Sequence, residues 1–184
     1  TAFFRESHHF PLLADHIKHK PDPVTIWCSA ASTGEEPYSI AMTLLETLGP
    51  KASQAKVIAT DIDTEALAKA RKGIYPQEQV RKLDEARVKR FFQKGTGNHI
   101  GLARVRPEVS ALVEFMPLNL LAPQWPVKGP FDAVFCRNIM IYFDKDTQAK
   151  ILKRFAPLMK PDGLLFAGHS ENFSYISDAF KLRG

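Results

Sequence analysis

The chain has few cysteines and no long apolar run. Only two of its 184 residues are cysteine, Cys28 and Cys136, and both lie in apolar segments that are typical of strands. Two half-buried thiols in a chain of this length fit a reducing cytoplasm better than a disulfide scaffold. No run approaches the ~18 apolar residues of a membrane-spanning helix, so the sequence predicts no membrane insertion.

Internal repeats and low-complexity tracts are also missing, and the composition is that of an ordinary globular chain. Hydrophobic residues make up 45% and charged residues 24%, which is enough apolar mass for the core of one α/β domain. The formal net charge is +5 and the pI is about 9.2. This mild excess favours solubility, and it also favours an acidic partner, either a nucleic acid or a glutamate-rich protein surface.

Strand-like and helix-like segments alternate along the first part of the chain. The expected elements are strands at 24–32 and 55–63 and helices at 35–49 and 64–75. We expect Thr64 to cap the second helix and Gly73 to end it. The alternation predicts a parallel α/β sheet.

The alternation breaks between about residues 88 and 116. A Gly-Thr-Gly turn there is followed by short alternating runs, which predict a small antiparallel insertion. The parallel rhythm then resumes. The expected elements are a strand at 132–135, a helix at 144–163 that starts near Asp144 or Asp146 and is stopped by Pro161 and Gly163, and a strand at 164–173.

The loop after the first strand, "AASTGEEP", has one glycine and two adjacent carboxylates, Glu35 and Glu36. In an open parallel sheet such a loop is the default ligand site. A phosphate cradle needs bare backbone N–H groups, glycines and often a lysine, and two carboxylates repel pyrophosphate. The loop therefore favours a ligand with a positive charge, an amino group or hydroxyls, unless the acids only complement the helix dipole.

Another acid, Asp61, follows the second strand. Its separation from the first loop is near the roughly 20 residues at which an acid binds ribose hydroxyls. An acid in this place also occurs in dehydrogenases. Together with Glu36, however, it describes a nucleoside that carries hydroxyls and a cationic or amino arm but no phosphates, and S-adenosylmethionine has those parts.

The third polar cluster follows the strand at 132–135. Arg137 and Asn138 come at the end of that strand, and Tyr142 lies in the turn or helix that follows. These side chains either satisfy carbonyls and pack in the core or line the same crevice as the two acidic loops. The second interpretation is favoured, because Arg and Asn at the carboxyl end of a strand rarely serve packing.

These stretches together resemble one family, the chemotaxis receptor methyltransferases (CheR). The matching segments span nearly the whole chain: "TAFFRE", "SAASTGEEPYSIA", "ATDID", "KGIY", the "GTG" turn, "FDAVFCRNIMIYFD", "APLMKPDGLLFAGHSENF" and "LRG". The resemblance implies a Rossmann-like, S-adenosylmethionine-dependent methyltransferase fold. It implies methyl transfer to glutamate side chains of bacterial chemoreceptors, with S-adenosylhomocysteine as the product and no metal. In the family this reaction serves chemotactic adaptation.

The resemblance also implies roles for single residues. Asp61 is expected on the ribose hydroxyls, Glu36 on the cationic or amino side of the ligand, and Tyr142 near the transferring methyl group. Asn119 and Leu120 are expected beside the adenine. The expected catalytic residues are Arg5 and Tyr142, and the expected cofactor contacts are Thr1, Arg5, Glu36, Asp61, Asn119, Leu120, Arg137 and Asn138.

Family members carry a small helical domain before "TAFFRE", an asparagine two residues before its threonine, and a final strand after "LRG". We therefore expect residues 1–184 to form one methyltransferase domain with a β-subdomain at about 88–116, without the helical domain and the last strand. In the family this subdomain binds a peptide at the receptor's tail. Lys94, Arg104 and Arg106 either attract such an acidic tail to a sheet edge or only solubilise a hairpin.

Three other functions compete with this one. "GHSE" places His169 and Glu171 as in zinc deaminases, but no Pro-Cys-x-x-Cys follows, so a metal site of that kind is not expected. A nucleic-acid methyltransferase would need a basic stripe with stacking aromatics, and the basic residues look dispersed. A module that binds the cofactor or the receptor tail with little activity is the non-catalytic alternative.

For the favoured function, the expected partners are the cytoplasmic helices of the receptor.

Overall fold

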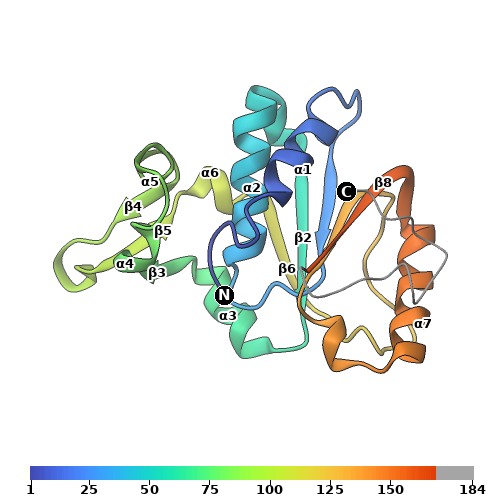
Figure 1. Ribbon diagram of the computed structural model, residues 1–184. Coiled ribbons are helices and arrows are strands. Elements are labelled where there is room, and N and C mark those ends of the chain that lie inside the picture. The colour runs from blue at the N-terminus through green and yellow to red at the C-terminus, as the bar shows by residue number, and fades with distance from the viewer. Residues whose placement is uncertain (169–184) are drawn as a thin grey trace.

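The computed structural model describes residues 1–168, and the strands of its larger sheet all run parallel. The strand order is β6-β2-β1-β7-β8, and every neighbouring pair is parallel. The strands are β1 (Thr25–Cys28), β2 (Lys56–Asp61), β6 (Val113–Pro117), β7 (Phe131–Cys136) and β8 (Met159–Ala167). The predicted parallel α/β sheet is confirmed (Figure 1).

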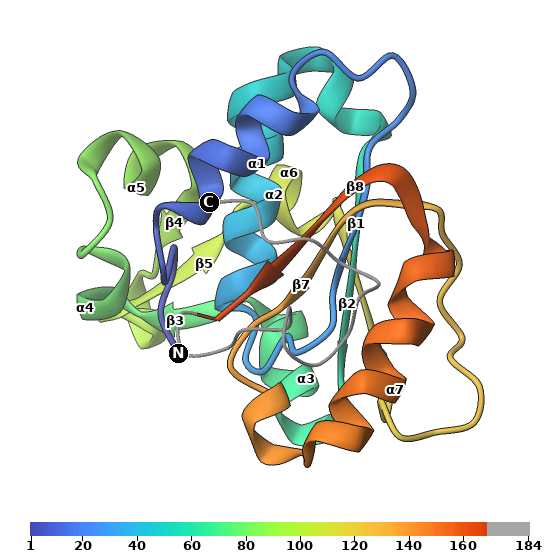
Figure 2. The ribbon, with the colours of Figure 1, turned by 45° about the vertical axis from the view of Figure 1, so that its right-hand side comes forward.

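Helices cover both faces of this sheet. Residues of α1 (His9–Ile17), α2 (Glu35–Leu48) and α3 (Thr64–Lys72) belong to one hydrophobic core, and residues of α7 (Lys145–Phe155) belong to the other. Figure 2 shows α1 and α2 on one side of the sheet and α7 on the opposite side. Short 3₁₀ turns complete the layers: η1 (Gly49–Gln54), η3 (Met140–Tyr142) and η4 (Ala156–Leu158).

The residues of β1 show how the strands serve two cores at once. Ile26 and Cys28 face the α1–α2 core, whereas Trp27 faces the α7 core. Successive side chains of a strand point to opposite faces, so a short apolar run is buried on both sides. The fully buried Trp27 ring meets the aromatic rings of Trp125, Phe131 and Phe155, with centroid distances of 5.3, 5.7 and 5.2 Å.

The residue that caps α3 differs from the prediction, whereas the end of α3 and the start of α7 agree with it. Asp63, not Thr64, caps α3, because its carboxylate accepts hydrogen bonds from the backbone N–H groups of Glu65 and Ala66. Gly73 ends that helix in the left-handed conformation, as predicted. Asp144 caps α7, also as predicted, since it accepts from the N–H of Thr147.

The predicted end of the last helix is wrong. α7 stops at Phe155, and the chain continues through η4 with a proline in its first turn, where the missing N–H cannot extend the helix. Pro161 and Gly163, expected as helix stops, lie inside β8 instead. They fall where the pairing of β8 with β7 shifts register, between Phe131 and Ala133, so they lie in an irregular stretch of the strand.

A separate three-stranded sheet projects from the side of the domain (Figure 1). Its strands are β3 (Ile74–Pro76), β4 (Phe92–Lys94) and β5 (Leu102–Val105), in the antiparallel order β3-β5-β4. Short helical segments join them: α4 (Gln77–Val80), α5 (Glu85–Phe91) and η2 (Gly97–His99). A further short helix, α6 (Pro107–Ser110), leads from β5 to β6 of the larger sheet.

The bounds of this small sheet differ from the expected 88–116. It begins at Ile74, because Gly73 at φ +62° turns the chain out of α3 and straight into β3. It ends at Val105, and β6, which the expected range mostly included, pairs in parallel with β2 in the larger sheet. Within residues 1–168 no helix is both long and apolar enough to cross a bilayer.

Replacing Trp27 with alanine should be among the most destabilising substitutions in the domain. The change removes a fully buried ring and its bond from Nε1 to Thr60 Oγ1 of 3.0 Å, so we expect a loss of about 3–5 kcal/mol in the free energy of unfolding. Chemical denaturation measures it. Trp125→Ala removes a partly buried ring of the same cluster and should cost less; an equal or larger loss at Trp125 would contradict this description of the core.

Candidate functional site

The strand order reverses between β1 and β7. The chain moves outward from β1 to β2 and β6, then returns to the other side of β1 with β7 and β8. Ligands of open α/β sheets bind beyond the carboxyl ends of the strands at such a reversal. The polar segments that the sequence singled out follow β1, β2 and β7 at this same edge.

An ion pair joins the segments that follow β1 and β7 at this reversal. Glu36, in the first turn of α2, pairs through Oε1 with Nε of Arg137, the residue after β7. The side chain of Arg137 is 2% exposed and that of Glu36 is 12% exposed, so both partners are almost fully withdrawn from water. Glu36 Oε2 also accepts from the thiol of Cys28 at 3.0 Å. Burial, and next the Glu36 carboxylate, raise the pKa of Cys28, which keeps the thiol a donor.

Arg137 also holds the N-terminal segment, residues 1–8, across the strand ends. Its Nη1 donates to the backbone carbonyl of Arg5 at 2.7 Å and to Nδ1 of His9 at 3.0 Å. The amide of Asn138 donates to Glu6 Oε2 at 3.3 Å. The side chain of Arg5 does not take part in these bonds and is exposed. The structure therefore brings Arg5, Glu36, Arg137 and Asn138 together.

Asp61 lies beside the first loop, as predicted from its place at the end of β2. Its Oδ2 accepts from the backbone N–H of Ser32 at 2.8 Å and its Oδ1 from that of Asp63 at 2.9 Å. An ionised carboxylate has about four lone-pair sites, so these two bonds fix its orientation and leave capacity for hydroxyls. The backbone carbonyl of Asp61 accepts from Leu118 N, which brings the neighbouring Asn119 to the same edge.

Four residues other than glycine have positive φ angles near this edge of the sheet. Phe4, Glu6, Ser32 and Asn138 have φ values of +54°, +51°, +50° and +60°. The left-handed region is uncommon for residues other than glycine, and it persists only where surrounding structure enforces it. All four belong to segments that meet at the ends of β1 and β7, which marks this edge as a candidate functional site.

The remaining predicted site residues differ in exposure. Thr1 and Asn119 are exposed, and Tyr142, in η3, is 78% exposed. Leu120 is 5% exposed and belongs to the α7 core together with Trp27. The side chain of Leu120 therefore packs into the core, and only its backbone can border a ligand at the strand ends.

Sequence reasoning missed the role of Glu35. Glu35 is 5% exposed, and its carboxylate accepts from Thr33 Oγ1 at 2.5 Å and from Gln79 Nε2 at 3.0 Å. Tyr75, from β3, donates its hydroxyl to the Thr33 carbonyl at 2.7 Å, and burial raises its pKa. Glu35 thus ties the first loop to α4, and Tyr75 ties the same loop to β3, which goes beyond any effect on the helix dipole. No local pattern could reveal this, since Gln79 lies 44 positions away.

Gly34 is required where this loop turns into α2. Its φ is +101°, and a Cβ there would lie 2.7 Å from the hydroxyl of Tyr75 and 3.0 Å from the Cβ of Ala70. The one glycine of the loop therefore serves close packing against the small sheet and α3. It does not serve approach to a phosphate.

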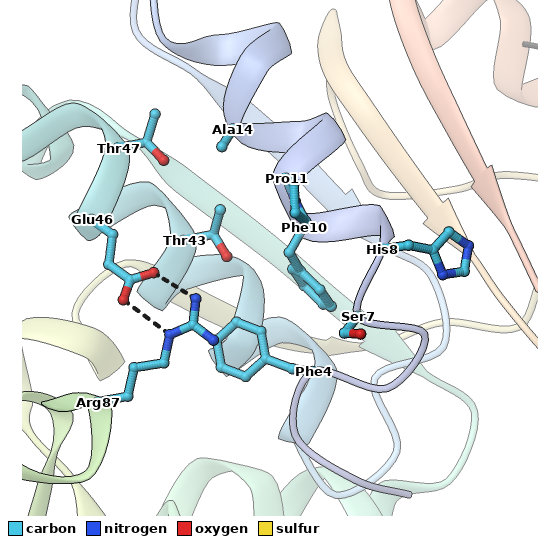
Figure 3. Close-up of a pocket in the computed structure, with 10 residues that line it drawn as sticks. All are labelled: Phe4, Ser7, His8, Phe10, Pro11, Ala14, Thr43, Glu46, Thr47 and Arg87. Atoms are coloured by element: carbon cyan, nitrogen blue, oxygen red, sulfur yellow. Dashed lines mark hydrogen bonds and ion pairs between the residues drawn. The ribbon is translucent and has the colours of Figure 1, made fainter. Parts of the chain in front are cut away.

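A cavity of about 420 Å³ lies elsewhere, between α1, α2 and α5 (Figure 3). Its charged lining residues are already paired, since Arg87 binds Glu46 through two bonds of 3.0 Å. The same guanidinium lies 3.9 Å above the ring of Phe4. None of the predicted site residues lines this cavity, so we place the candidate site at the strand ends.

Metal ligands are not gathered in the described part of the chain. Among residues 1–168 no group of three or more His, Cys, Asp or Glu side chains is arranged to hold an ion. His169 and Glu171, weighed above as part of a metal motif, lie outside the described residues.

Comparison with known proteins identifies close relatives. A family model described as CheR methyltransferase, SAM binding domain, matches residues 1–184. The chemotaxis protein methyltransferase of Escherichia coli (strain K12) is 62% identical over 184 residues, which cover all of this chain and 64% of that protein. Chemotaxis protein methyltransferase 2 of Pseudomonas aeruginosa is 54% identical over 180 residues, which cover 96% of this chain and 64% of that protein.

Solved structures show the same fold at low identity. Cofactor-bound Rv0187 from MTB has a TM-score of 0.53 and 16% identity, covering 91% of this chain and 56% of that one. The CcbJ methyltransferase from Streptomyces caelestis has a TM-score of 0.51 and 14% identity, covering 89% of this chain and 50% of that one. The chain spans just under two thirds of the length of the curated relatives named above.

Removing the Tyr75 hydroxyl should loosen the first loop. Tyr75→Phe leaves the Thr33 carbonyl without its partner and should cost about 1 kcal/mol of stability. We expect faster amide hydrogen exchange at residues 29–34. Tyr38→Phe is the matched control, since it removes a similar bond from the Tyr38 hydroxyl to the Ala70 carbonyl at 2.6 Å. If Tyr38→Phe loosened these amides as much as Tyr75→Phe, the fastening role of Tyr75 would be wrong.

Proposed function

This chain belongs to the CheR methyltransferase family, and we propose that it transfers a methyl group from S-adenosylmethionine to glutamate side chains of bacterial chemoreceptors. The products are glutamate methyl esters and S-adenosylhomocysteine, formed in the cytoplasm during chemotactic adaptation. The observation that carries the proposal is the pair of carboxylates, Glu36 and Asp61, which lie at the strand ends where a phosphate-binding protein carries glycines and a lysine.

The residues at this edge fit S-adenosylmethionine. Asp61, oriented by two backbone N–H groups, has acceptor capacity for the ribose hydroxyls. Glu36 presents a carboxylate to the cationic and amino end. Asn119 and Leu120 border the adenine through the segment that follows β6. Thr1, Arg5, Arg137 and Asn138 close the site, as the bonds of Arg137 to the N-terminal segment support.

Bound S-adenosylmethionine supplies a methyl group activated by a sulfonium. The chain's own residues need not generate a nucleophile, because a glutamate side chain has a reference pKa near 4.3 and is ionised at neutral pH. Their task is to align the substrate carboxylate with the methyl group and to exclude water. Attack of an anion on a cation neutralises charge, so a dry site favours the reaction.

Two exposed side chains are suited to the incoming glutamate. Arg5 stands on the segment that Arg137 holds, and its guanidinium can bind a carboxylate through two hydrogen bonds. Tyr142 lies on the turn just after Arg137 and Asn138, with its ring directed to solvent. We propose that Arg5 attracts and orients the substrate carboxylate and that Tyr142 borders the transferring methyl group.

The small sheet is a candidate second contact with the receptor. β4 is an edge strand, paired with β5 alone, and a peptide in extended conformation can add to such an edge. Lys94 and Arg104 are exposed around it, and Arg104 donates to Gln93 on the same pair of strands. We propose that an acidic segment at the receptor's tail binds here.

A methyl-transfer assay with tritiated S-adenosylmethionine tests the function. We expect base-labile methyl groups on the receptor, because carboxyl esters hydrolyse in base, and less transfer to a receptor that lacks its tail. RNA serves as the alternative acceptor. Label on RNA, or label on the receptor that resists base, would overturn the proposed reaction. Equal transfer to both receptors would remove the role of the small sheet.

Asp61→Ala should weaken the binding of S-adenosylhomocysteine by about 10- to 100-fold, the value of hydrogen bonds to a charged group. Isothermal titration calorimetry measures the affinity. Asp63→Ala is the matched control two positions away: it removes the cap of α3 and should cost about 0.5–2 kcal/mol of stability while the affinity stays unchanged. Unaltered affinity in Asp61→Ala would refute the ribose assignment.

A further inference from the structure

The bonds of Arg137 include one partner that neither the motif nor the resemblance pointed to. Its Nε donates to Glu36, and its two Nη1 hydrogens have two acceptors, the Arg5 carbonyl at 2.7 Å and His9 Nδ1 at 3.0 Å. A guanidinium is planar, so acceptors on both sides of Nη1 fix its rotation as well as its position. The imidazole of His9 is therefore one of three acceptors that orient the arginine.

His9 is built to act as an acceptor. Burial lowers its pKa to about 4, with further lowering by the charge of Arg137 and by His8, while Glu6 opposes the shift. At neutral pH the ring is uncharged, and the contact with a donor that cannot lose its proton assigns the lone pair to Nδ1. A protonated ring would set two cations against each other at 3.0 Å.

Three elements hold the His9 ring in place. His9 is the first residue of α1, its ring lies 4.3 Å from that of His8, and its other neighbour is Phe166 of β8 at 5.2 Å between centroids. The ring is thus fixed by the packing of α1 against the end of the sheet. By accepting from Arg137 Nη1, the fixed ring restricts the rotamers of the long Arg137 side chain.

We propose that His9 is a positioning residue for cofactor binding, holding the Arg137 guanidinium so that the Glu36 carboxylate keeps its place at the carboxyl ends of the strands. The proposal rests on the proposed function, since it names what orients the same site. His9 itself need not touch the cofactor. A change at His9 should therefore alter cofactor affinity only when Arg137 is present, and an experiment can distinguish this dependence from a simple loss of packing.

Three substitutions at one position distinguish the acceptor from the ring. Asparagine places an amide oxygen near where Nδ1 stands, glutamine extends its amide toward the Nε2 position, and leucine has no acceptor. In the full protein we expect His9→Leu and His9→Gln to bind S-adenosylhomocysteine about tenfold more weakly, the net value of one hydrogen bond to a charged group. His9→Asn should stay within about threefold of the wild type, all measured by calorimetry.

A double-mutant cycle tests whether the effect passes through Arg137. In an Arg137→Met background, His9→Leu should cause no further loss of affinity. Thermal melts accompany each variant, and if His9→Leu fails to fold, the comparison of His9→Gln with His9→Asn decides. Rescue by asparagine together with coupling to Arg137 is a result that a purely structural role would not produce.

The outcomes separate the two proposals. Wild-type protein that does not bind S-adenosylhomocysteine would overturn the proposed function and this inference with it. Wild-type binding with equal affinity in all three His9 variants would overturn the inference alone. Equal weakening in all three variants, or an undiminished effect of His9→Leu in the Arg137→Met background, would also overturn it.

Discussion

The ion pair of Glu36 with Arg137 joins the two halves of the sheet where the strand order reverses. One partner comes from the helix after β1 and the other from the end of β7, and both side chains are almost fully withdrawn from water. Removing one member of such a pair leaves an uncompensated charge and typically costs about 3–5 kcal/mol. The N-terminal segment depends on the same arginine, because its backbone is bound there.

The three carboxylates near the ends of β1 and β2 have different roles. Glu35 is buried and bound to Thr33 and Gln79, so it belongs to the scaffold. Glu36 is held by Arg137 and Cys28 at the strand ends, and its side chain keeps 12% exposure. Asp61 is oriented by backbone N–H groups. Environment, more than sequence position, separates a structural acid from the acids that can meet a ligand.

Much of this could be predicted from the sequence, and the rest fails for physical reasons. The periodicity of apolar residues and the turn residues predicted the parallel sheet. They also predicted that Asp61 and Arg137 lie at one edge of it, because local sequence patterns determine where strands end. The bounds of the small sheet were missed because β3 and β4 have three residues each, too few for a period to show. The bonds of Glu35 and His9 join residues far apart in the chain, and no local signal carries such contacts.

The most direct test of the account is a crystal structure of the protein with S-adenosylhomocysteine bound. The account predicts the ligand at the carboxyl ends of β1 and β2, with ribose hydroxyls within about 3.2 Å of the Asp61 carboxylate and the Glu36–Arg137 pair intact beside its amino end. A ligand seated in the cavity between α1, α2 and α5, or at the strand ends with its ribose away from Asp61, would contradict the account.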